Sequence, residues 1–424
     1  MKDTFPRFDM KKPPRPCWPL FRLLLWLLCF PGVWAHRTKI TKVNTQGLKP
    51  PYLLLGNHNA FQDMKASIAA NFPHVPNYIV AIDGFIGREW LLRAIGCICR
   101  RKFTNDAMSV RHMMRVIKDK GVVGLYPEAR YSLCGTTAVL PEDMGKLVKL
   151  LHVPVVLLLC HGHHVNSPFW NTKRDRKVKP MEATMEVILS VEDIDRMTPE
   201  EINTLLVEKF QYDDFRWQKE KGVRVTDPHR ADGLERVLYQ CPHCKTEYQM
   251  HHEDTAIYCA SCGKHWDFLE DGSLRAREGE TEFDHVPDWY EWQRQNVRQE
   301  IRENRYSSGI LPVTVESLPN AKAFIPLGEG TFLHDMTGFH VQVTDKDGDI
   351  HTMEKDVLSM YSVHIEYRYL FTHGDGVDLN TLTDTWYCYP HDAPFSITKM
   401  ALATEELYYY EREKAGNPCP PGLA

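Results

Sequence analysis

The feature that most constrains the fold of this chain is an apolar run at positions 52–55, which stops at Gly56 and gives way to a helical pattern from about Asn59. A run of this kind suits a buried strand, and a strand that leads directly into a helix is the repeating unit of parallel sheets. Catalytic and ligand-binding side chains gather at the carboxyl ends of such strands. The sequence therefore predicts an α/β fold with His58 in the turn between this strand and its helix.

Asp63 follows His58 at a spacing of five residues. Five helical steps turn about 500°, so two side chains of one helix at this spacing would point roughly 140° apart. His58 must therefore precede the helix if Asp63 is to reach it. A carboxylate bonded to one ring nitrogen fixes the tautomer and leaves the other nitrogen to take a proton from an alcohol. The alternative is that His58 only caps the helix and Asp63 only favours its positive end.

The segment NHNAFQD resembles the first motif of the glycerolipid acyltransferases, the lysophosphatidate acyltransferase family, which has a His, four residues and an Asp. Three more blocks follow in the family's order, at residues 96–102 (GCICRRK), 126–132 (YPEARYS) and 153–156 (VPVV). The resemblance implies an O-acyltransferase in which His58 is the general base and Asp63 orients it. It implies transfer of a fatty acyl group from acyl-coenzyme A or acyl carrier protein to a hydroxyl of a lysophospholipid or glycerolipid-like acceptor.

The first block has Ala60 in place of the family's usual Ser two residues after the His, and the second and third blocks also depart from the family pattern. The second usually ends in Arg and here ends in Lys102, and in the third Arg130 takes the usual Thr place and Tyr131 the usual Arg place. The resemblance implies that these blocks hold the phosphate and head group of the acceptor. We therefore expect Lys102 and Arg130 to bind anionic groups and Glu128 to orient the acceptor or its loop. Backbone N–H groups near the helix start after His58 are the expected donors to a tetrahedral oxyanion.

Two other functions remain open at this stage. A non-catalytic lipid-binding adaptor would keep the cleft and lose the chemistry, and the departures at Lys102 and Tyr131 favour it. A hydrolase would use the same His58–Asp63 pair on water. The intact pair favours an enzyme, and the sequence does not separate transfer to an alcohol from transfer to water.

The first 37 residues consist of a basic tail and an apolar segment. Residues 1–50 hold ten Lys or Arg against two Asp, although the whole chain has a net charge of −5. The apolar segment at 18–35 is short of the roughly 20 residues that span a bilayer. Its three Trp and basic flanks favour a helix in the interface, with a signal peptide as the alternative. We expect membrane lipids as partners at the cytoplasmic face of a membrane, and no nucleic acid.

Residues 38–221 form the predicted acyltransferase domain. Apolar runs at 78–82, 122–126 and 153–160 alternate with helical spacing, so the fold class is α/β, with a mostly parallel sheet and flanking helices. A cluster of histidines follows the third run, at His161, His163 and His164. It forms either a polar rim of the cleft or a metal site.

Residues 222–285 carry two CxxC pairs separated by fourteen residues, Cys241 with Cys244 and Cys259 with Cys262. Four thiolates at this spacing are typical of a tetrahedral zinc site, and the segment resembles a zinc ribbon. We expect a structural Zn²⁺ held by these four residues; the alternative is four unligated thiols. Because the segment lacks a dense basic face, a protein partner is the favoured role for it.

Residues 286–424 begin with a polar helix over about 287–306 and continue with short strands from Ile310. A last helix covers about 397–414, and a Pro/Gly-rich tail runs to Ala424. Short strands closed by a helix suggest a β-rich domain that resembles a pleckstrin-homology barrel. A protein partner is possible here as well.

Overall fold

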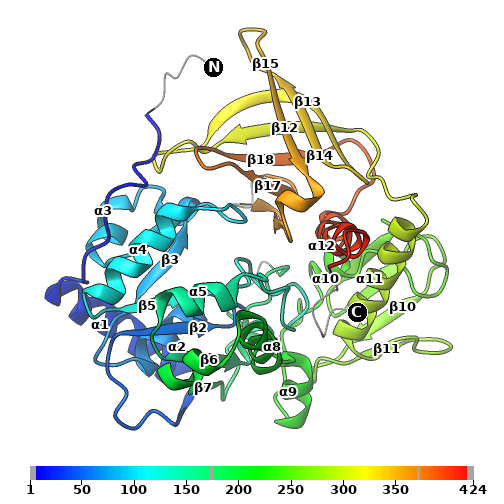
Figure 1. Ribbon diagram of the computed structural model, residues 1–424. Coiled ribbons are helices and arrows are strands. Elements are labelled where there is room, and N and C mark those ends of the chain that lie inside the picture. Colours follow the sequence, from blue (N-terminus) through cyan, green and yellow to red (C-terminus); the bar gives the residue numbers. More distant parts are fainter. Residues whose placement is uncertain (1–5, 172–174, 370–372, 418–424) are drawn as a thin grey trace.

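A sheet of seven strands organises the N-terminal half of the chain in the computed structural model, which describes residues 6–171, 175–369 and 373–417 (Figure 1). The predicted C-terminal tail from residue 418 onward lies outside the described residues. The strands are β1 (Lys39–Val43), β2 (Tyr52–Gly56), β3 (Asn77–Ala81), β4 (Ile98–Arg100), β5 (Val122–Leu125), β6 (Val155–His161) and β7 (Glu182–Leu189).

The order of these strands across the sheet is β1-β7-β6-β2-β5-β3-β4. All neighbours run parallel except β6 and β7, which are antiparallel. The predicted mostly parallel α/β sheet is therefore confirmed. Because β2 lies between β5 and β6, the carboxyl ends of these three strands meet at one edge of the sheet, and the segments that follow them lie side by side.

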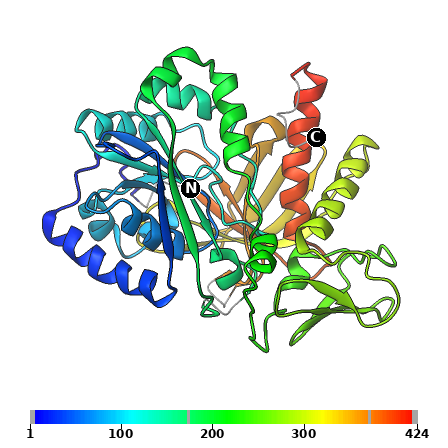
Figure 2. The same ribbon diagram turned by 90° about the horizontal axis from the view of Figure 1, so that it is seen from below.

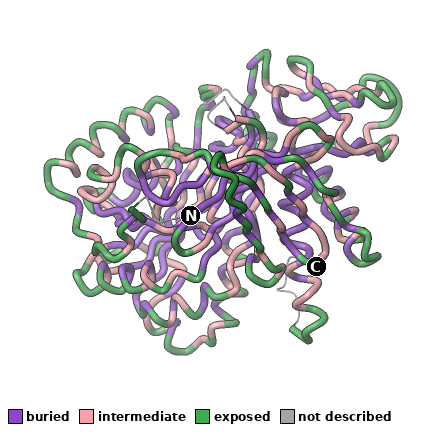
Figure 3. The backbone as a smooth tube through the Cα atoms, turned by 90° about the horizontal axis from the view of Figure 1, so that it is seen from above, coloured by how far each residue is buried: buried purple, intermediate pink, exposed green. Residues whose placement is uncertain are grey.

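Both faces of this sheet are covered by helices, which explains why its central strands are apolar throughout. Leu53 and Leu55 of β2 belong to the core under α4, α5, α7 and α8, whereas Tyr52 and Leu54 belong to the core under α2. Figure 3 shows the buried strands at the centre of the molecule. The helices of this half are α1 (Pro19–Ala35), α2 (Gln62–Ala70), α3 (Glu89–Ala94), α4 (Ala107–Lys118), α5 (Met144–Leu151), α6 (His163–Asn166), α7 (Val191–Arg196), α8 (Pro199–Lys209) and α9 (Asp214–Glu220), with the 3-10 helix η1 (Ile82–Phe85) after β3.

Helix α1 packs against α2 along the outer edge of the molecule (Figure 2). It contains 17 residues, and among the described residues no helix is both long and apolar enough to cross a membrane. One face of α1 is exposed nonetheless. Its exposed apolar side chains are Leu20, Leu23, Leu24, Leu27, Leu28 and Trp34, and Trp18 is exposed at the N-cap just before the helix.

The cysteine-rich segment forms a small antiparallel sheet of four strands, in the order β11-β10-β9-β8. It is preceded by the short helix α10 (Leu234–Val237) and consists of β8 (Met250–Glu253), β9 (Ala256–Cys259), β10 (His265–Phe268) and β11 (Leu274–Ala276). Trp266 of β10 packs edge-on against Trp289 of the following helix α11 (Val286–Arg302), with ring centroids 5.1 Å apart.

The C-terminal region is a seven-stranded antiparallel sheet in the order β15-β14-β13-β12-β18-β17-β16. The first strand thus pairs with the last, and α12 (Ile397–Lys414) follows and packs on α11, as the predicted terminal helix. One hydrophobic core runs through the small sheet, both helices and this sheet. The strands are β12 (Leu311–Ser317), β13 (Ile325–Asp335), β14 (Gly338–Thr344), β15 (Ile350–Asp356), β16 (His364–Glu366), β17 (Gly376–Asn380) and β18 (Thr385–Pro390), with the 3-10 helix η2 (Val357–Ser359) before β16.

Arg101 of the second sequence block joins the two halves of the molecule. Its buried guanidinium donates to the backbone carbonyls of Leu318, Pro319 and Thr383 at 2.9–3.1 Å, and to the hydroxyl of Thr385 at 2.6 Å. A planar group with several fixed donors can satisfy four acceptors at once, which a lysine cannot. This block therefore ties the α/β half to the C-terminal sheet.

We expect Arg101→Ala to lower the unfolding free energy by about 3 kcal/mol or more, because it leaves several buried acceptors without a donor. Urea denaturation of both proteins measures the difference. Arg111→Ala, on the exposed face of α4, is the matched control and should change stability by less than about 0.5 kcal/mol. Equal stability of the Arg101 and Arg111 variants would contradict this role for Arg101.

Candidate active site

The structure brings His58 and Asp63 together as the sequence predicted. His58 lies in the turn between β2 and α2, and its Nδ1 is 3.2 Å from Oδ2 of Asp63 in the first turn of α2. The flanking asparagines are buried and hold this turn. Asn57 exchanges two hydrogen bonds with the backbone of Cys160 on β6, and Asn59 accepts a hydrogen bond from the hydroxyl of Tyr212.

Asp63 is fully buried, and four donors converge on its carboxylate. The backbone N–H groups of Asn59 and Ala60 donate to Oδ2 at 2.6 and 2.9 Å, together with His58, and Nδ1 of His163 lies 2.5 Å from Oδ1. Burial alone would raise the pKa of Asp63, but the hydrogen bonds from His163 and His58 lower it to about 2. The ionised carboxylate can only accept hydrogen bonds, so both imidazoles carry their proton on Nδ1.

His163 is the residue that the sequence did not assign to this pair. It follows β6, which lies beside β2, so the carboxyl ends of the two strands bring His163 to Asp63. The turn between β6 and α6 is itself fixed by the buried Asp214, whose carboxylate accepts from the N–H groups of Gly162 and His164. The signal in the sequence was a histidine cluster directly after an apolar strand. A local sequence pattern does not predict which strand lies beside β2 in the sheet, so it did not connect this cluster to Asp63.

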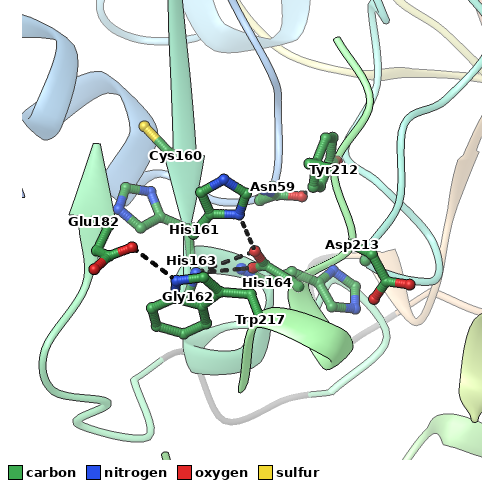
Figure 4. Close-up of polar contacts among 12 residues, drawn as sticks. Asn59, Cys160, His161, Gly162, His163, His164, Glu182, Tyr212, Asp213 and Trp217 are labelled. Atoms are coloured by element: carbon green, nitrogen blue, oxygen red, sulfur yellow. Dashed lines mark hydrogen bonds and ion pairs between the residues drawn. The ribbon is translucent and has the colours of Figure 1, made fainter. Parts of the chain in front are cut away.

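The three histidines after β6 have separate surroundings (Figure 4). His163 bonds Asp63, His161 lies 3.5 Å from Asp214 and stacks on Trp217, and His164 is buried between Trp170 and Phe215. Burial lowers the pKa of His164 to about 4. In the described part of the chain these three residues do not converge on one point as metal ligands.

A different group, Asp63, Cys160 and His163, does have ligand atoms within 4.8 Å of one another. Burial raises the pKa of the Cys160 thiol well above its ordinary value, so the sulfur is held protonated. His163 and Asp63 already satisfy each other by a hydrogen bond. Asp63 and His163 therefore form a hydrogen-bonded support for His58.

The imidazole of His58 lies between two tyrosine rings of the third block. Tyr126 stacks on it at a centroid distance of 4.3 Å and 17°, and Tyr131 lies at 4.3 Å and 40°. The backbone of His58 is held by the same block, because its N–H donates to Glu128 and its carbonyl accepts from the N–H of Ser132. The first and third blocks thus form one site around this ring.

Glu128 is buried beneath His58. Burial raises the pKa of Glu128 to about 8, although the hydrogen bond from His58 N–H and the charge of Arg130 act in the opposite direction. The predicted role of orienting the loop fits its bond to His58, and it does not line the large cavity described below.

Three of the backbone N–H groups nearest to the predicted oxyanion site already have partners. The N–H groups of Asn59 and Ala60 donate to Asp63, and that of His58 donates to Glu128. These three amides are therefore engaged with the side chains of Asp63 and Glu128.

His58 opens onto a cavity of about 1760 Å³ that lies between the two halves of the molecule. Ligand pockets commonly measure about 300–1,000 Å³, so this one has room for two substrates. Part of its lining is apolar and comes from one hydrophobic cluster, through Leu25 of α1, Met64 and Ile68 of α2, and Leu92 and Ile95 around α3. The C-terminal region contributes further lining residues, from η2, β16 and α12.

Lys102 and Arg130 both line this cavity, and each already has an anionic partner from the C-terminal region. Nζ of Lys102 is 3.4 Å from Asp378, and Nη2 of Arg130 is 2.6 Å from Glu405 of α12, which Arg294 of α11 also binds. Burial lowers the pKa of Lys102, but the nearby carboxylates, Asp378 first, outweigh it and raise the pKa. The two residues predicted to bind anions therefore lie at the site as paired cations.

The four cysteines of the small sheet form a compact cluster. Their sulfurs lie within 4.8 Å of one another, with Cys241–Cys262 at 3.8 Å and Cys244–Cys259 at 3.7 Å. With Zn–S bonds of about 2.3 Å, the sulfurs of a tetrahedral site are about 3.8 Å apart, so the cluster can hold one zinc ion. All four positions are filled by protein, which is the arrangement of a structural site.

Comparisons with known proteins add a similarity of structure. No model of a protein family matches the chain, and no curated protein matches its sequence. Among solved structures, it is similar to the 1-acyl-sn-glycerophosphate acyltransferase PlsC from Thermotoga maritima, with 13% identity and a TM-score of 0.36 over 45% of this chain and 76% of that chain. A similarity at this level decides neither the family nor the reaction.

The raised pKa of Glu128 predicts how stability changes with pH. The folded protein holds this proton up to a pH of about 8, whereas the ordinary carboxyl value is 4.5. The contribution of this proton to the free energy of unfolding is therefore complete below pH 4.5. It is lost as the pH rises towards about 8, by up to about 1.4 kcal/mol per pH unit. The free energy of unfolding in urea should therefore decrease from pH 4.5 to pH 8 more steeply in the wild-type protein than in Glu128→Gln. An equal pH dependence of the two proteins would contradict a neutral Glu128.

We expect purified protein to contain one zinc ion per chain by mass spectrometry under native conditions. Cys241→Ser together with Cys259→Ser should remove it and destabilise the shared core around Trp266, because a structural zinc contributes directly to folding. Cys134→Ser, a buried thiol outside the cluster, is the control and should keep the metal. Folded wild-type protein without metal would contradict the zinc site.

Proposed function

We propose that this protein is an acyltransferase that moves a fatty acyl group from acyl-coenzyme A or acyl carrier protein to a hydroxyl of a lysophospholipid or glycerolipid-like acceptor. The observation that carries the proposal is the His58–Asp63 pair at the wall of the large cavity. Asp63 binds Nδ1, so the free lone pair of the ring is on Nε2. No hydrogen bond or ion pair engages Nε2 within the described ranges.

The proposed reaction uses His58 twice. Its Nε2 takes the proton of the acceptor hydroxyl while the oxygen attacks the thioester carbonyl, which forms a tetrahedral intermediate. Collapse of this intermediate breaks the carbon–sulfur bond, and the imidazolium returns the proton to the departing thiolate. The ester and the free thiol are the products, and Asp63 stabilises the imidazolium between the two steps.

The apolar part of the cavity lining supports a substrate with a long apolar chain. It includes Leu25 of α1, the helix whose outer face carries exposed leucines and tryptophans. An exposed apolar face on a helix too short to span a bilayer is typical of a helix that lies in the membrane interface. We therefore propose that α1 rests on the membrane and that acyl chains reach the cavity beside it.

A non-catalytic lipid-binding adaptor is the second candidate. Ion pairs tie Lys102 to Asp378 and Arg130 to Glu405, so the second and third blocks have structural partners in the C-terminal region. An adaptor would use the same cavity without the chemistry. The two candidates differ in whether His58 is needed for any turnover.

His58→Ala should abolish acyl transfer and leave the fold intact, because the ring is partly exposed at the cavity wall. The assay is the incubation of wild-type and variant protein with labelled acyl-coenzyme A or acyl carrier protein and a panel of lysolipids, followed by mass spectrometry of the lipids. Removal of a general base lowers rates by roughly 10²–10⁴-fold. His74→Ala, an exposed histidine that does not line the cavity, is the control. Unchanged turnover in His58→Ala would rule out the proposed base.

The membrane contact has its own test. Leu28 is 72% exposed on α1, and Ile350 is 64% exposed at the far end of the molecule on β15. Burying a leucine in the interface contributes about 1.5 kcal/mol, so Leu28→Glu should weaken binding to anionic lipid vesicles about tenfold in a sedimentation assay. Ile350→Glu introduces the same charge and should leave binding unchanged. Equal effects of the two variants would contradict docking through α1.

A further inference from the structure

One corner of the cavity is built from both halves of the molecule and carries an excess of acid. Asp83 of η1 and Lys102 after β4 come from the α/β half, and His364 and Glu366 come from β16. Asp378 of β17 lies behind them, with its side chain only 1% exposed. This corner adjoins the catalytic histidine, because Tyr131, which packs on His58, also lines the cavity.

Three carboxylates in this corner share one lysine and one histidine as their partners. Lys102 Nζ lies 3.4 Å from Asp378 and 4.0 Å from Asp83, and His364 lies 3.3 Å from Asp378 and 3.6 Å from Glu366. Oδ1 of Asp378 is the atom that Nδ1 of His364 approaches, and within the described chain no hydrogen-bond donor reaches the carboxylate of Glu366. Burial, with Asp83 and Asp378 nearby, raises the pKa of Glu366 to about 7 against the effect of His364 and Lys102. The corner therefore holds more carboxylates than it holds lysine or arginine side chains paired with them.

Aromatic rings complete the same wall. Phe169 packs against Tyr131 with centroids 5.4 Å apart and against Tyr367 at 5.6 Å, and it also contacts His364 edge-on. All four side chains line the cavity. Carboxylates combined with aromatic faces are the surroundings that attract an alkylated ammonium ion, which the faces hold through their negative quadrupole.

We propose that this corner binds a cationic head group of the acceptor, an alkylammonium, with Glu366 and Asp83 as its counter-charges and Tyr131, Phe169 and Tyr367 as its aromatic wall. The inference rests on the proposed function in taking the cavity as the acceptor site. It assigns Lys102 a structural role as the internal counter-ion of Asp378. A phosphate at Lys102 would have to displace that pair and face two further carboxylates.

The experiment measures binding without acyl donor, so that no turnover is needed. Calorimetry on the full chain compares three dodecyl amphiphiles below their micelle concentrations, with trimethylammonium, maltoside or phosphate as head group. We expect the ammonium amphiphile to bind at least tenfold more tightly than the maltoside. Glu366→Gln should weaken binding of the ammonium amphiphile about tenfold and leave binding of the maltoside unchanged. It should not weaken binding of the phosphate amphiphile.

Glu200→Gln, at an exposed carboxylate on the rim of the same cavity, is the matched control and should change none of the three. Asp83→Asn is a second variant that should act in the same direction as Glu366→Gln, and thermal unfolding checks that each variant is folded. Ammonium binding no tighter than maltoside binding, or equal losses of both in Glu366→Gln, would overturn the proposal. A protein that binds as expected and transfers no acyl group would contradict only the proposed function.

Discussion

The buried charge of Asp63 is the interaction on which the site depends. A carboxylate without water is stable only when donors satisfy it, and here two imidazoles and two backbone amides do so. That requirement fixes the turn after β2, the ring of His58 and the position of His163 after β6. The neighbouring strands β2 and β6 supply these groups at one edge of the sheet. The geometry needed to hold the charge is therefore also the geometry that leaves Nε2 of His58 free as a base.

The C-terminal region completes the cavity as well as covering it. It is joined to the α/β half by the guanidinium of Arg101 and by the ion pairs of Lys102 and Arg130. All three cations belong to the second and third sequence blocks, so these blocks carry contacts between the halves in addition to lining the cavity. This arrangement gives the departures at Lys102 and Tyr131 a physical reason. In the head-group proposal the acceptor would meet Glu366 of β16, Asp83 of η1 and aromatic rings from both halves there, next to a lysine that is already paired.

The sequence was most informative where one segment determines its own structure. The strands β2, β5 and β6 are apolar because both faces of the sheet are covered, and the spacing of His58 and Asp63 required the turn that is observed. The strand β1 was not predicted, because its residues KITKV are polar and mostly exposed at the sheet edge. The role of His163 depends on strand order, and the partners of Lys102 and Arg130 lie 276 and 275 residues away. No local pattern encodes such contacts.

The central claim is that ionised Asp63 holds His58 in the tautomer with its proton on Nδ1 and a free lone pair on Nε2. Nitrogen-15 NMR of labelled histidine at pH 8 tests it most directly, with the His58 signals assigned by subtracting the spectrum of His58→Ala. The account predicts a protonated Nδ1 and an unprotonated Nε2 in wild-type protein, and a mixture of tautomers in Asp63→Ala. A proton on Nε2 of His58 in the wild-type protein would contradict it.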